Sequence, residues 1–352
     1  MYDTDEPITD VALKSDPAID PLILNITSLL VGNVLTVSMC LFGVVTNLIN
    51  IPLFRRQGYH DGVNVTLTAL AISDLGALLG ELVYTAIVDP YIKEIDLVVS
   101  KVVIGVISGY WHEYFTRVSS VITAFAAFER CLCVTRPLKV KTMITTRTAV
   151  VVNVSIFVVH SLYLFPQFYT MYFDWAFMPE RNKTVFVVYV NSLSASMFPI
   201  TLYFTDMLFP YCTFLALVVC CTVLLFTLKA KAKWRRTVVS SAVEVEVKPT
   251  SRHLTSKERK SGLLFLSVSI MCVVLLLPQH IVYTAVIFVR EMAMDGDYSD
   301  IRTVVGTFTV LLQAINSSMT IFIYYKMSTK YRSEFQKMMG KYDCLQFLKK
   351  DT

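Results

Sequence analysis

The chain has 352 residues, of which 55% are hydrophobic and only 17% are charged, and its formal net charge is +5. Soluble proteins carry about 25% charged residues, so the composition excludes an ordinary soluble domain. Apolar runs long enough to cross a bilayer recur between charged segments, which predicts an all-α, polytopic membrane protein. We expect no nucleic-acid partner.

The N-terminal segment, residues 1–28, is acidic and contains the glycosylation sequon Asn25-Ile26-Thr27. Its first residues lack the apolar region of a cleaved signal peptide, so we expect the first membrane helix to act as the targeting signal. An acidic arm with a sequon suits an extracellular N-terminus.

Seven apolar segments predict membrane-spanning helices, at residues 29–53, 63–88, 101–134, 148–168, 194–228, 261–289 and 303–325. Basic residues crowd the connections after the first, third, fifth and seventh segments, whereas acidic residues and a second sequon, Asn182-Lys183-Thr184, lie in the others. The positive-inside rule therefore predicts an outside N-terminus and an inside C-terminus. We expect a multi-pass protein of the plasma membrane. Within the basic tail, 326–352, residues 328–339 favour an amphipathic surface helix.

The third segment carries a polar stripe that a lipid-facing helix cannot hold cheaply. Counted from His112, the residues Thr116, Ser119, Thr123 and Arg130 follow at helical spacing and share one face. We therefore expect the other helices to surround this one.

The spans carry an ordered series of marks: Asn47, Asp74 at the end of LAISD, Glu129-Arg130-Cys131 followed by Pro137, Pro166, Pro210, Pro278, Asn316-Ser317 before Thr320-Ile321-Phe322-Ile323-Tyr324, and Tyr331-Arg332. Together they resemble the rhodopsin-like (class A) G-protein-coupled receptors from about Leu29 to Met339. The pattern is most similar to divergent chemosensory-type or peptide receptors of invertebrates. This resemblance implies a seven-helix bundle, an extracellular ligand, a heterotrimeric G protein and no enzymatic activity.

Several positions depart from the family pattern. Gly105 stands where the family usually has an extracellular cysteine, and the second outer loop lacks the partner cysteine. Both halves of the bridge are absent together, so we expect no disulfide and leave the rigidity of this loop open. Leu276 replaces the usual aromatic residue of the sixth span, and Ile321 replaces the proline of NPxxY.

The resemblance implies a switch at the inner end of the bundle. Arg130, beside Glu129, would pair with Glu258 just before the sixth span, near Tyr324 of the seventh. Breaking such a pair lets the sixth span swing outward and opens a groove for a helix of the G protein. Alternatively, Arg130 and Glu258 are ordinary solvated charges at the membrane boundary.

A second set of polar residues falls in the middle of the membrane: Asn47, Asp74, Ser119, Asn316 and Ser317. These oxygens resemble the family's sodium site, because a hard cation takes oxygen ligands. The alternative is a hydrogen-bonded network around a protonated Asp74. An allosteric sodium ion at Asp74 is the only cofactor or metal considered.

The outer half of the bundle is expected to hold a ligand pocket. Its candidate residues are Glu81, Tyr84, His112, Glu113, Arg117, Tyr203, Asp206, Gln279, His280, Tyr283 and Gln313. We predict that Arg117 pairs with either Asp206 or Glu113; this pair could also be structural, with the aromatic residues serving only in packing.

Two ligand classes are disfavoured by the resemblance. His112 replaces the aspartate that usually binds amines, and Ala314 replaces the lysine that binds retinal. The mixture of acids, histidines and one arginine suits a small zwitterionic or peptide-like ligand.

A transporter and a membrane enzyme are the two alternatives to a receptor. A transporter or proton-linked carrier could use Asp74, Glu81, Glu113, Arg117 and Asp206, and it would be insensitive to mutation of Arg130. A membrane enzyme ranks last, because the chain has no HExxH motif and no GxSxG motif in a strand–helix context. The basic connection Lys229–Lys260 could meet anionic membrane lipid, and Cys344 could carry palmitate.

Overall fold

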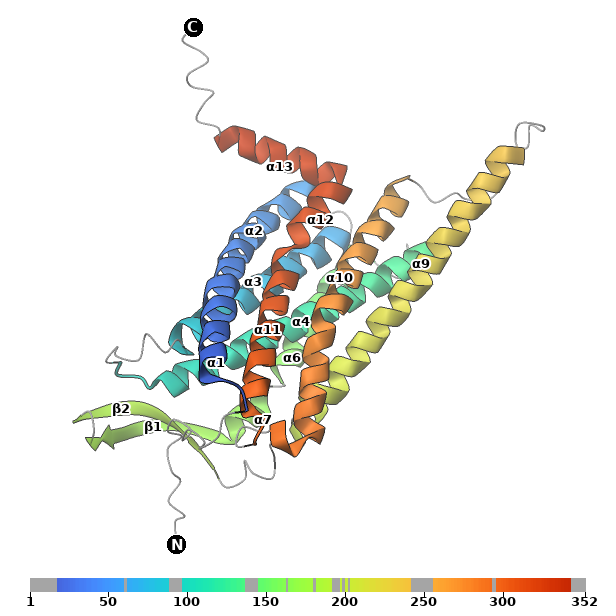
Figure 1. Ribbon diagram of the computed structural model, residues 1–352. Coiled ribbons are helices and arrows are strands. Elements are labelled where there is room, and N and C mark those ends of the chain that lie inside the picture. The colour runs from blue at the N-terminus through green and yellow to red at the C-terminus, as the bar shows by residue number, and fades with distance from the viewer. Residues whose placement is uncertain are drawn as a thin grey trace, which may run out of the picture.

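The computed structural model describes residues 18–59, 62–88, 97–136, 145–162, 164–179, 182–191, 197, 200–201, 203–241, 256–292 and 296–342. In these ranges seven helical segments are long and apolar enough to cross a membrane, which confirms the predicted seven-helix class. They form one bundle (Figure 1). We call the end that carries the β-hairpin the outer end and the end that carries α13 the inner end, following the predicted orientation.

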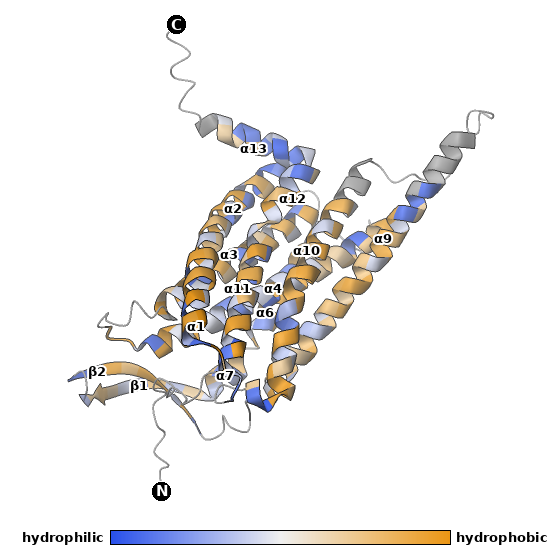
Figure 2. Cartoon of the chain, viewed as in Figure 1, coloured by the Kyte–Doolittle hydropathy of each residue, from blue (hydrophilic) through white to orange (hydrophobic). Residues whose placement is uncertain are grey.

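In chain order the helical elements are α1 (Pro21–Thr27), η1 (Ser28–Leu35), α2 (Thr36–Gln57), α3 (Gly62–Val88), α4 (Lys101–Thr135), α6 (Thr146–Ser161), α7 (Leu164–Tyr169), η4 (Tyr203–Leu208), α9 (Phe209–Ser241), α10 (Ser256–Phe288), η5 (Arg290–Met292), α11 (Ser299–Ser318), α12 (Thr320–Met327) and α13 (Thr329–Tyr342). The strands are β1 (Met171–Met178) and β2 (Lys183–Val190). Hydrophobic residues dominate the bundle helices, whereas α13 is mostly hydrophilic (Figure 2).

The first span begins earlier than the predicted residue 29, because the signals that start its helix lie before the apolar run. Asp20 caps the helix by accepting a hydrogen bond from the backbone N–H of Leu22 at 2.8 Å, and Pro21 occupies the first turn. The span ends at Gly58, whose φ of 83° suits a glycine at a helix C-terminus.

The fifth and sixth helices extend beyond the membrane into the segment predicted as a basic loop. α9 continues past residue 228 to Ser241, and α10 already starts at Ser256. The segment after residue 228 is rich in alanine, lysine and arginine and lacks glycine and proline, so nothing in it stops the helix.

Close helix contacts depend on three glycines. A Cβ atom added at Gly43 of α2 would lie 2.1 Å from the hydroxyl oxygen of Ser318 in α11. At Gly76 of α3 it would lie 2.6 Å from the ring of Phe115, and at Gly80 2.8 Å from the backbone nitrogen of His112. The glycines therefore let α2 approach α11 and let α3 approach α4, which brings polar groups of these helices within bonding distance.

The loop expected after the fourth span contains an antiparallel β-hairpin. β1 pairs with β2 along its whole length, from Met171 opposite Val190 to Met178 opposite Lys183. Aromatic residues recur in β1 and valines in β2, and Asn182 in the turn has a φ of 47°, a conformation that asparagine tolerates. Figure 1 shows the hairpin at the outer end of the bundle, extending to one side of it.

Backbone hydrogen bonds hold this hairpin to the start of α4. The N–H of Phe186 donates to the carbonyl of Val98 at 2.9 Å, and the N–H of Ser100 donates to the carbonyl of Phe186 at 2.8 Å. The ammonium group of Lys183 also donates to the carbonyl of Leu97 at 3.2 Å. β2 thus pairs on both sides, and this pairing anchors the loop at the helix that carries Gly105 in place of the family's cysteine.

The inner end of the seventh span turns sharply into the surface helix. α11 ends at Ser318, α12 ends at Met327, and α13 crosses the inner end of the bundle (Figure 1). The ring of Tyr331 is buried against Phe54, and its hydroxyl donates to the side-chain oxygen of Asn50. Within α13, a hydrogen bond from Lys337 lowers the pKa of Glu334.

We predict that Gly43→Ala destabilises the protein, because the new methyl group meets Ser318 and Leu78 in a packed contact. Overpacking typically costs about 1–3 kcal/mol, which exceeds the helix propensity gained over glycine. The control is Gly306→Ala, where an added Cβ meets nothing within 4 Å. Thermal unfolding in detergent should show a lower midpoint for Gly43→Ala alone; equal midpoints for the two variants would contradict the packing.

We also predict slow hydrogen exchange at the amides of Ser100 and Phe186, because both donate to backbone carbonyls. Phe186→Pro removes one of these donors and should speed exchange at Ser100, whereas Thr184→Ser, which keeps the sequon and lies at an exposed position of the same strand, should not. Peptide-level exchange with mass-spectrometric detection measures both. Unprotected amides at Ser100 in the unmodified protein would show that the hairpin is not anchored.

Candidate functional site

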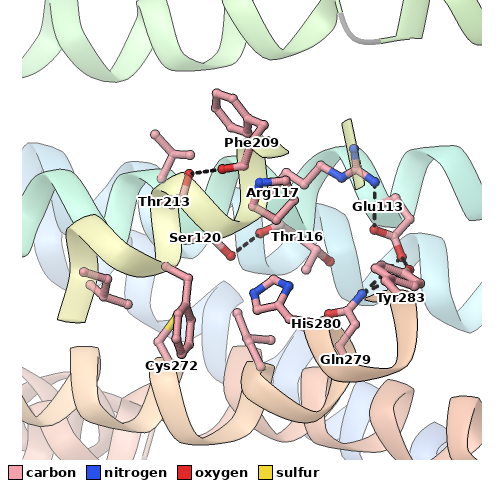
Figure 3. A pocket seen from close by; sticks show the side chains of 15 residues that line it. Glu113, Thr116, Arg117, Ser120, Phe209, Thr213, Cys272, Gln279, His280 and Tyr283 are labelled. Carbon is pink, nitrogen blue, oxygen red and sulfur yellow. Dashed lines mark hydrogen bonds and ion pairs between the residues drawn. The ribbon is translucent and has the colours of Figure 1, made fainter. Parts of the chain in front are cut away.

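A pocket with about 590 Å³ of empty volume lies between α4, α9 and α10 in the outer half of the bundle (Figure 3). Its lining residues are Glu113, Thr116, Arg117, Ser120, Val121, Phe209, Pro210, Thr213, Phe214, Leu217, Cys272, Leu276, Gln279, His280 and Tyr283. This volume includes space that is open to solvent.

One part of the pocket is a charged network around Glu113. Its carboxylate accepts a hydrogen bond from the hydroxyl of Tyr283 at 2.7 Å and a long one from the amide of Gln279 at 3.5 Å. The guanidinium group of Arg117 lies 3.5 Å from the other carboxylate oxygen, so the predicted Arg117–Glu113 pair is present. We call these four residues the Glu113 network; it joins α4 to α10.

Arg117 also reaches the fifth span. One of its terminal nitrogens donates to the backbone carbonyl of Thr205, in η4, at 2.8 Å. The alternative partner Asp206 has a side chain outside the described residues. η4 is a π-helix, so its backbone hydrogen bonds join residues five apart rather than four apart.

The rest of the pocket wall is apolar or weakly polar. Phe214 and Leu217 of α9 face Leu276 of α10, the residue that replaces the family's aromatic side chain. His280 lies between the Tyr211 and Phe214 rings, at centroid distances of 5.6 and 5.5 Å. The pocket therefore has a charged part and an apolar part, with His280 between them.

Three of the predicted pocket residues form a separate buried cluster between α3, α4 and α11. His112 contacts the carbonyl of Ala77 at 2.9 Å, the amide oxygen of Gln313 at 3.1 Å and the carboxylate of Glu81 at 3.6 Å. Thr85 donates to Glu81 at 2.9 Å. Because a carbonyl can only accept, the Nδ1 atom of His112 carries a proton. The cluster lies apart from the pocket lining.

Two further predicted residues also lie away from the pocket. The side chain of Tyr203 is 46% exposed and packs against Phe204, with ring centroids 5.4 Å apart. Tyr84 is partly exposed on α3, and its ring lies 3.7 Å from the position of a Cβ at Gly109. Glu113, Arg117, Gln279, His280 and Tyr283 are thus the sequence-predicted residues that the structure brings together around the pocket.

The mid-membrane residues surround Asp74, which is 1% exposed. Ser119 donates to its carboxylate at 2.6 Å, and the Ser317 hydroxyl also bonds to it. The amide of Asn47 donates to the backbone carbonyl of Ser317 at 2.9 Å. The side-chain oxygen of Asn316 is buried and has no hydrogen-bond partner among the described residues.

This donor set fits a sodium ion only in part. One carboxylate and two hydroxyls supply hard oxygen ligands, but a full shell needs further oxygens from water. Histidine, cysteine and carboxylate side chains can also form a metal site, but no group of three such residues in the described parts of the chain is arranged to hold a metal.

At the inner end, Arg130 and Glu129 are 9% and 2% exposed, and their side chains pair directly. The guanidinium group of Arg130 also lies 5.4 Å from the ring centroid of Phe265 in α10. The side chain of Glu258, the partner expected for Arg130, lies outside the described residues. Tyr324 packs edge-on against Phe54, with ring centroids 5.2 Å apart.

The inner ends of three helices are closed over an apolar cluster. Val134 of α4, Leu224 of α9 and Leu266 of α10 are buried together. Lys231 of α9 donates to the carbonyl of Val134 at 2.6 Å, which caps α4. This packing leaves no groove between these three residues.

Both predicted glycosylation sites lie at the outer end with exposed side chains. Asn25 is in the first turns of the first span, and Asn182 is in the turn of the hairpin.

Sequence reasoning missed most of the apolar wall. Thr116 was visible as part of the polar stripe of α4, but it was not assigned to the pocket. Phe214, Leu217 and Leu276 lie in continuous apolar runs, and such runs do not distinguish a pocket-facing residue from a lipid-facing one.

Comparison with protein families gives one assignment: the family model described as "serpentine type 7TM GPCR chemoreceptor Srw" matches residues 34–342. A comparison with curated proteins gives no match.

We predict that the Glu113 network stabilises the outer half of the bundle. Tyr283→Phe removes a hydrogen bond to a carboxylate, and such bonds contribute about 1.5–3 kcal/mol. The thermal midpoint should fall, and a double-mutant cycle with Glu113→Gln should show coupling. Tyr203→Phe, at an exposed tyrosine, is the control. Additive effects of Tyr283→Phe and Glu113→Gln would mean that the two side chains do not interact.

Proposed function

The chain belongs to the Srw family of serpentine, seven-transmembrane G-protein-coupled chemoreceptors, and on this premise we propose that its pocket binds an extracellular chemical cue and that its inner end activates a heterotrimeric G protein. The protein would reside in the plasma membrane with its N-terminus outside, and Asn25 and Asn182 would carry glycans. Family membership favours this reading over the carrier.

The observation that carries the proposal is the position of α10 between the pocket and the inner cluster. Its outer half supplies Gln279 and Tyr283 to the Glu113 network, and its inner half supplies Leu266 to the apolar cluster. Pro278 lies in the helix between these sites and removes one backbone hydrogen bond, which makes a pivot there. A ligand that prefers one position of α10 therefore shifts the inner end as well.

At the inner end, activation would separate Leu266 from Val134 and Leu224. The separation exposes an apolar groove between α4, α9 and α10, and an amphipathic helix of the G protein is the partner that fits such a groove. Arg130 lies beside this groove, against Phe265 of the moving helix, and its release would accompany the opening. Glu129, Glu258 and Tyr324 are proposed to take part in the same switch.

The Asp74 network would couple the two ends of the bundle. Through Ser119, Ser317 and Asn47 it joins α3, α4, α11 and α2. A sodium ion, if bound, would be held by the carboxylate of Asp74 and the hydroxyls of Ser119 and Ser317, where it would supply a positive charge. Movement of α11 against α3 alters these bonds, which makes the network sensitive to the state of the receptor.

Nucleotide exchange on a panel of purified G proteins tests this function. The receptor is placed in membranes and exposed to a library of small molecules, peptides and amino acids. We expect at least one ligand to raise exchange, and Arg130→Ala to lower that response by about tenfold or more, which corresponds to a coupling loss of about 1.4 kcal/mol. The control is Arg136→Ala, an exposed arginine just beyond the end of α4.

A response that Arg130→Ala leaves intact would contradict the proposed switch. Substrate flux into proteoliposomes without nucleotide exchange would instead establish the carrier.

A further inference from the structure

The charged residues of the pocket already have partners within the protein. Both oxygens of Glu113 are engaged, one by Tyr283 and Gln279 and the other by Arg117. Arg117 in turn donates to the carbonyl of Thr205. A charged ligand would have to break one of these contacts and leave the displaced group without its partner, which opposes binding.

Two other polar groups in the pocket lack hydrogen-bond partners among the described residues. The hydroxyl oxygen of Thr116 and the Nδ1 atom of His280 are buried, and neither has a hydrogen-bond partner in the part of the chain that the structure describes. Both residues line the pocket, and Thr116 is only 9% exposed. Buried polar groups are nearly always paired, so two such groups in one pocket indicate a missing partner.

The two groups come from facing helices. Thr116 is on α4 and His280 is on α10, and Figure 3 shows the His280 ring pointing from α10 toward α4. The Thr116 hydroxyl both donates and accepts, and the imidazole nitrogen does either, depending on its tautomer. An uncharged hydroxyl or carbonyl oxygen can therefore pair with either group, and with both where it lies between them.

The surroundings of this pair are apolar. Phe214, Leu217 and Leu276 form the neighbouring wall, and an apolar body placed there would be removed from water. The pocket is confined to stretches of α4, α9 and α10 and lies between helices of a bundle, where small-molecule sites are common.

From these observations we propose that the pocket selects an uncharged small amphiphile, whose hydroxyl or carbonyl group lies between Thr116 and His280 and whose apolar body packs against Phe214, Leu217 and Leu276. The inference rests on the receptor function proposed above and names the chemistry of its ligand. The proposed ligand differs from the zwitterionic one that the charged residues of the sequence suggest, because Glu113 and Arg117 already pair with groups of the protein.

The first test needs no ligand. Thr116→Val keeps the shape of the side chain and removes the hydroxyl, so the ligand-free protein should unfold at the same temperature or a higher one. Ser119→Ala is the matched control: the buried Ser119 hydroxyl on the same helix donates to the carboxylate of Asp74 in α3 at 2.6 Å, and its removal should lower the midpoint. A clear loss of stability in Thr116→Val would show that its hydroxyl already has a partner, which overturns the proposal.

The second test uses matched probes on the full chain in lipid nanodiscs. Straight-chain alcohols and methyl ketones from butyl to decyl are compared with the carboxylates and amines of equal length, and saturable thermal stabilisation reports binding. We expect neutral members to stabilise the unmodified protein and to lose at least tenfold in affinity in Thr116→Val and in His280→Phe. Stabilisation that persists in both variants reports partition into the lipid and counts against the site.

Either stronger binding of the carboxylates or amines, or no saturable binding by any neutral probe, would overturn the proposed ligand class. Because this binding assay contains no G protein, its failure is distinct from failure of the receptor function. Ligand-driven nucleotide exchange without binding of neutral probes would support the receptor function and contradict only the proposed ligand class.

Discussion

The structure depends on one constraint: the polar side chains of α4 have no water in the membrane and must find partners on other helices. His112 bonds to α3 and α11, Glu113 to α10, Arg117 to η4 and Ser119 to α3. Each bond fixes a neighbouring helix against α4. The central position of α4 and the order of the helices around it thus follow from satisfying these groups.

The same principle extends beyond the membrane. The outer loop lacks the covalent bridge that related receptors are expected to have, yet it is not left unattached. β2 bonds through its backbone to Val98 and Ser100, immediately before α4. Backbone pairing depends on extended geometry rather than on a particular side chain, so the loss of both cysteines does not remove it. The hairpin is therefore held at the start of the same helix that supplies Glu113 and Arg117 to the pocket.

The ligand specificity that we propose for the pocket depends on which of its polar side chains already have partners within the protein. Where side chains pair with each other, as in the Glu113 network, their polar groups already have partners within the protein. Where polar groups have no partner among the described residues, as at Thr116 and His280, the proposed ligand would supply the missing hydrogen bonds. Gln279 and Tyr283 belong to the same helix as Leu266, so the proposed coupling between the pocket and the inner end runs through one continuous element.

The sequence by itself determined the seven spans and the buried position of α4, because bilayer thickness and helical periodicity act on the chain locally. The Arg117–Glu113 pair was also within reach, since the two residues are one turn apart. Only the tertiary structure decided the rest. It separated His112, Glu81 and Gln313 from the pocket, because glycines at positions 76 and 80 bring α3 against α4 there. It also gave the hairpin its anchor and Thr116 its place beside His280, since both depend on which distant backbones approach each other, and no local pattern encodes that approach.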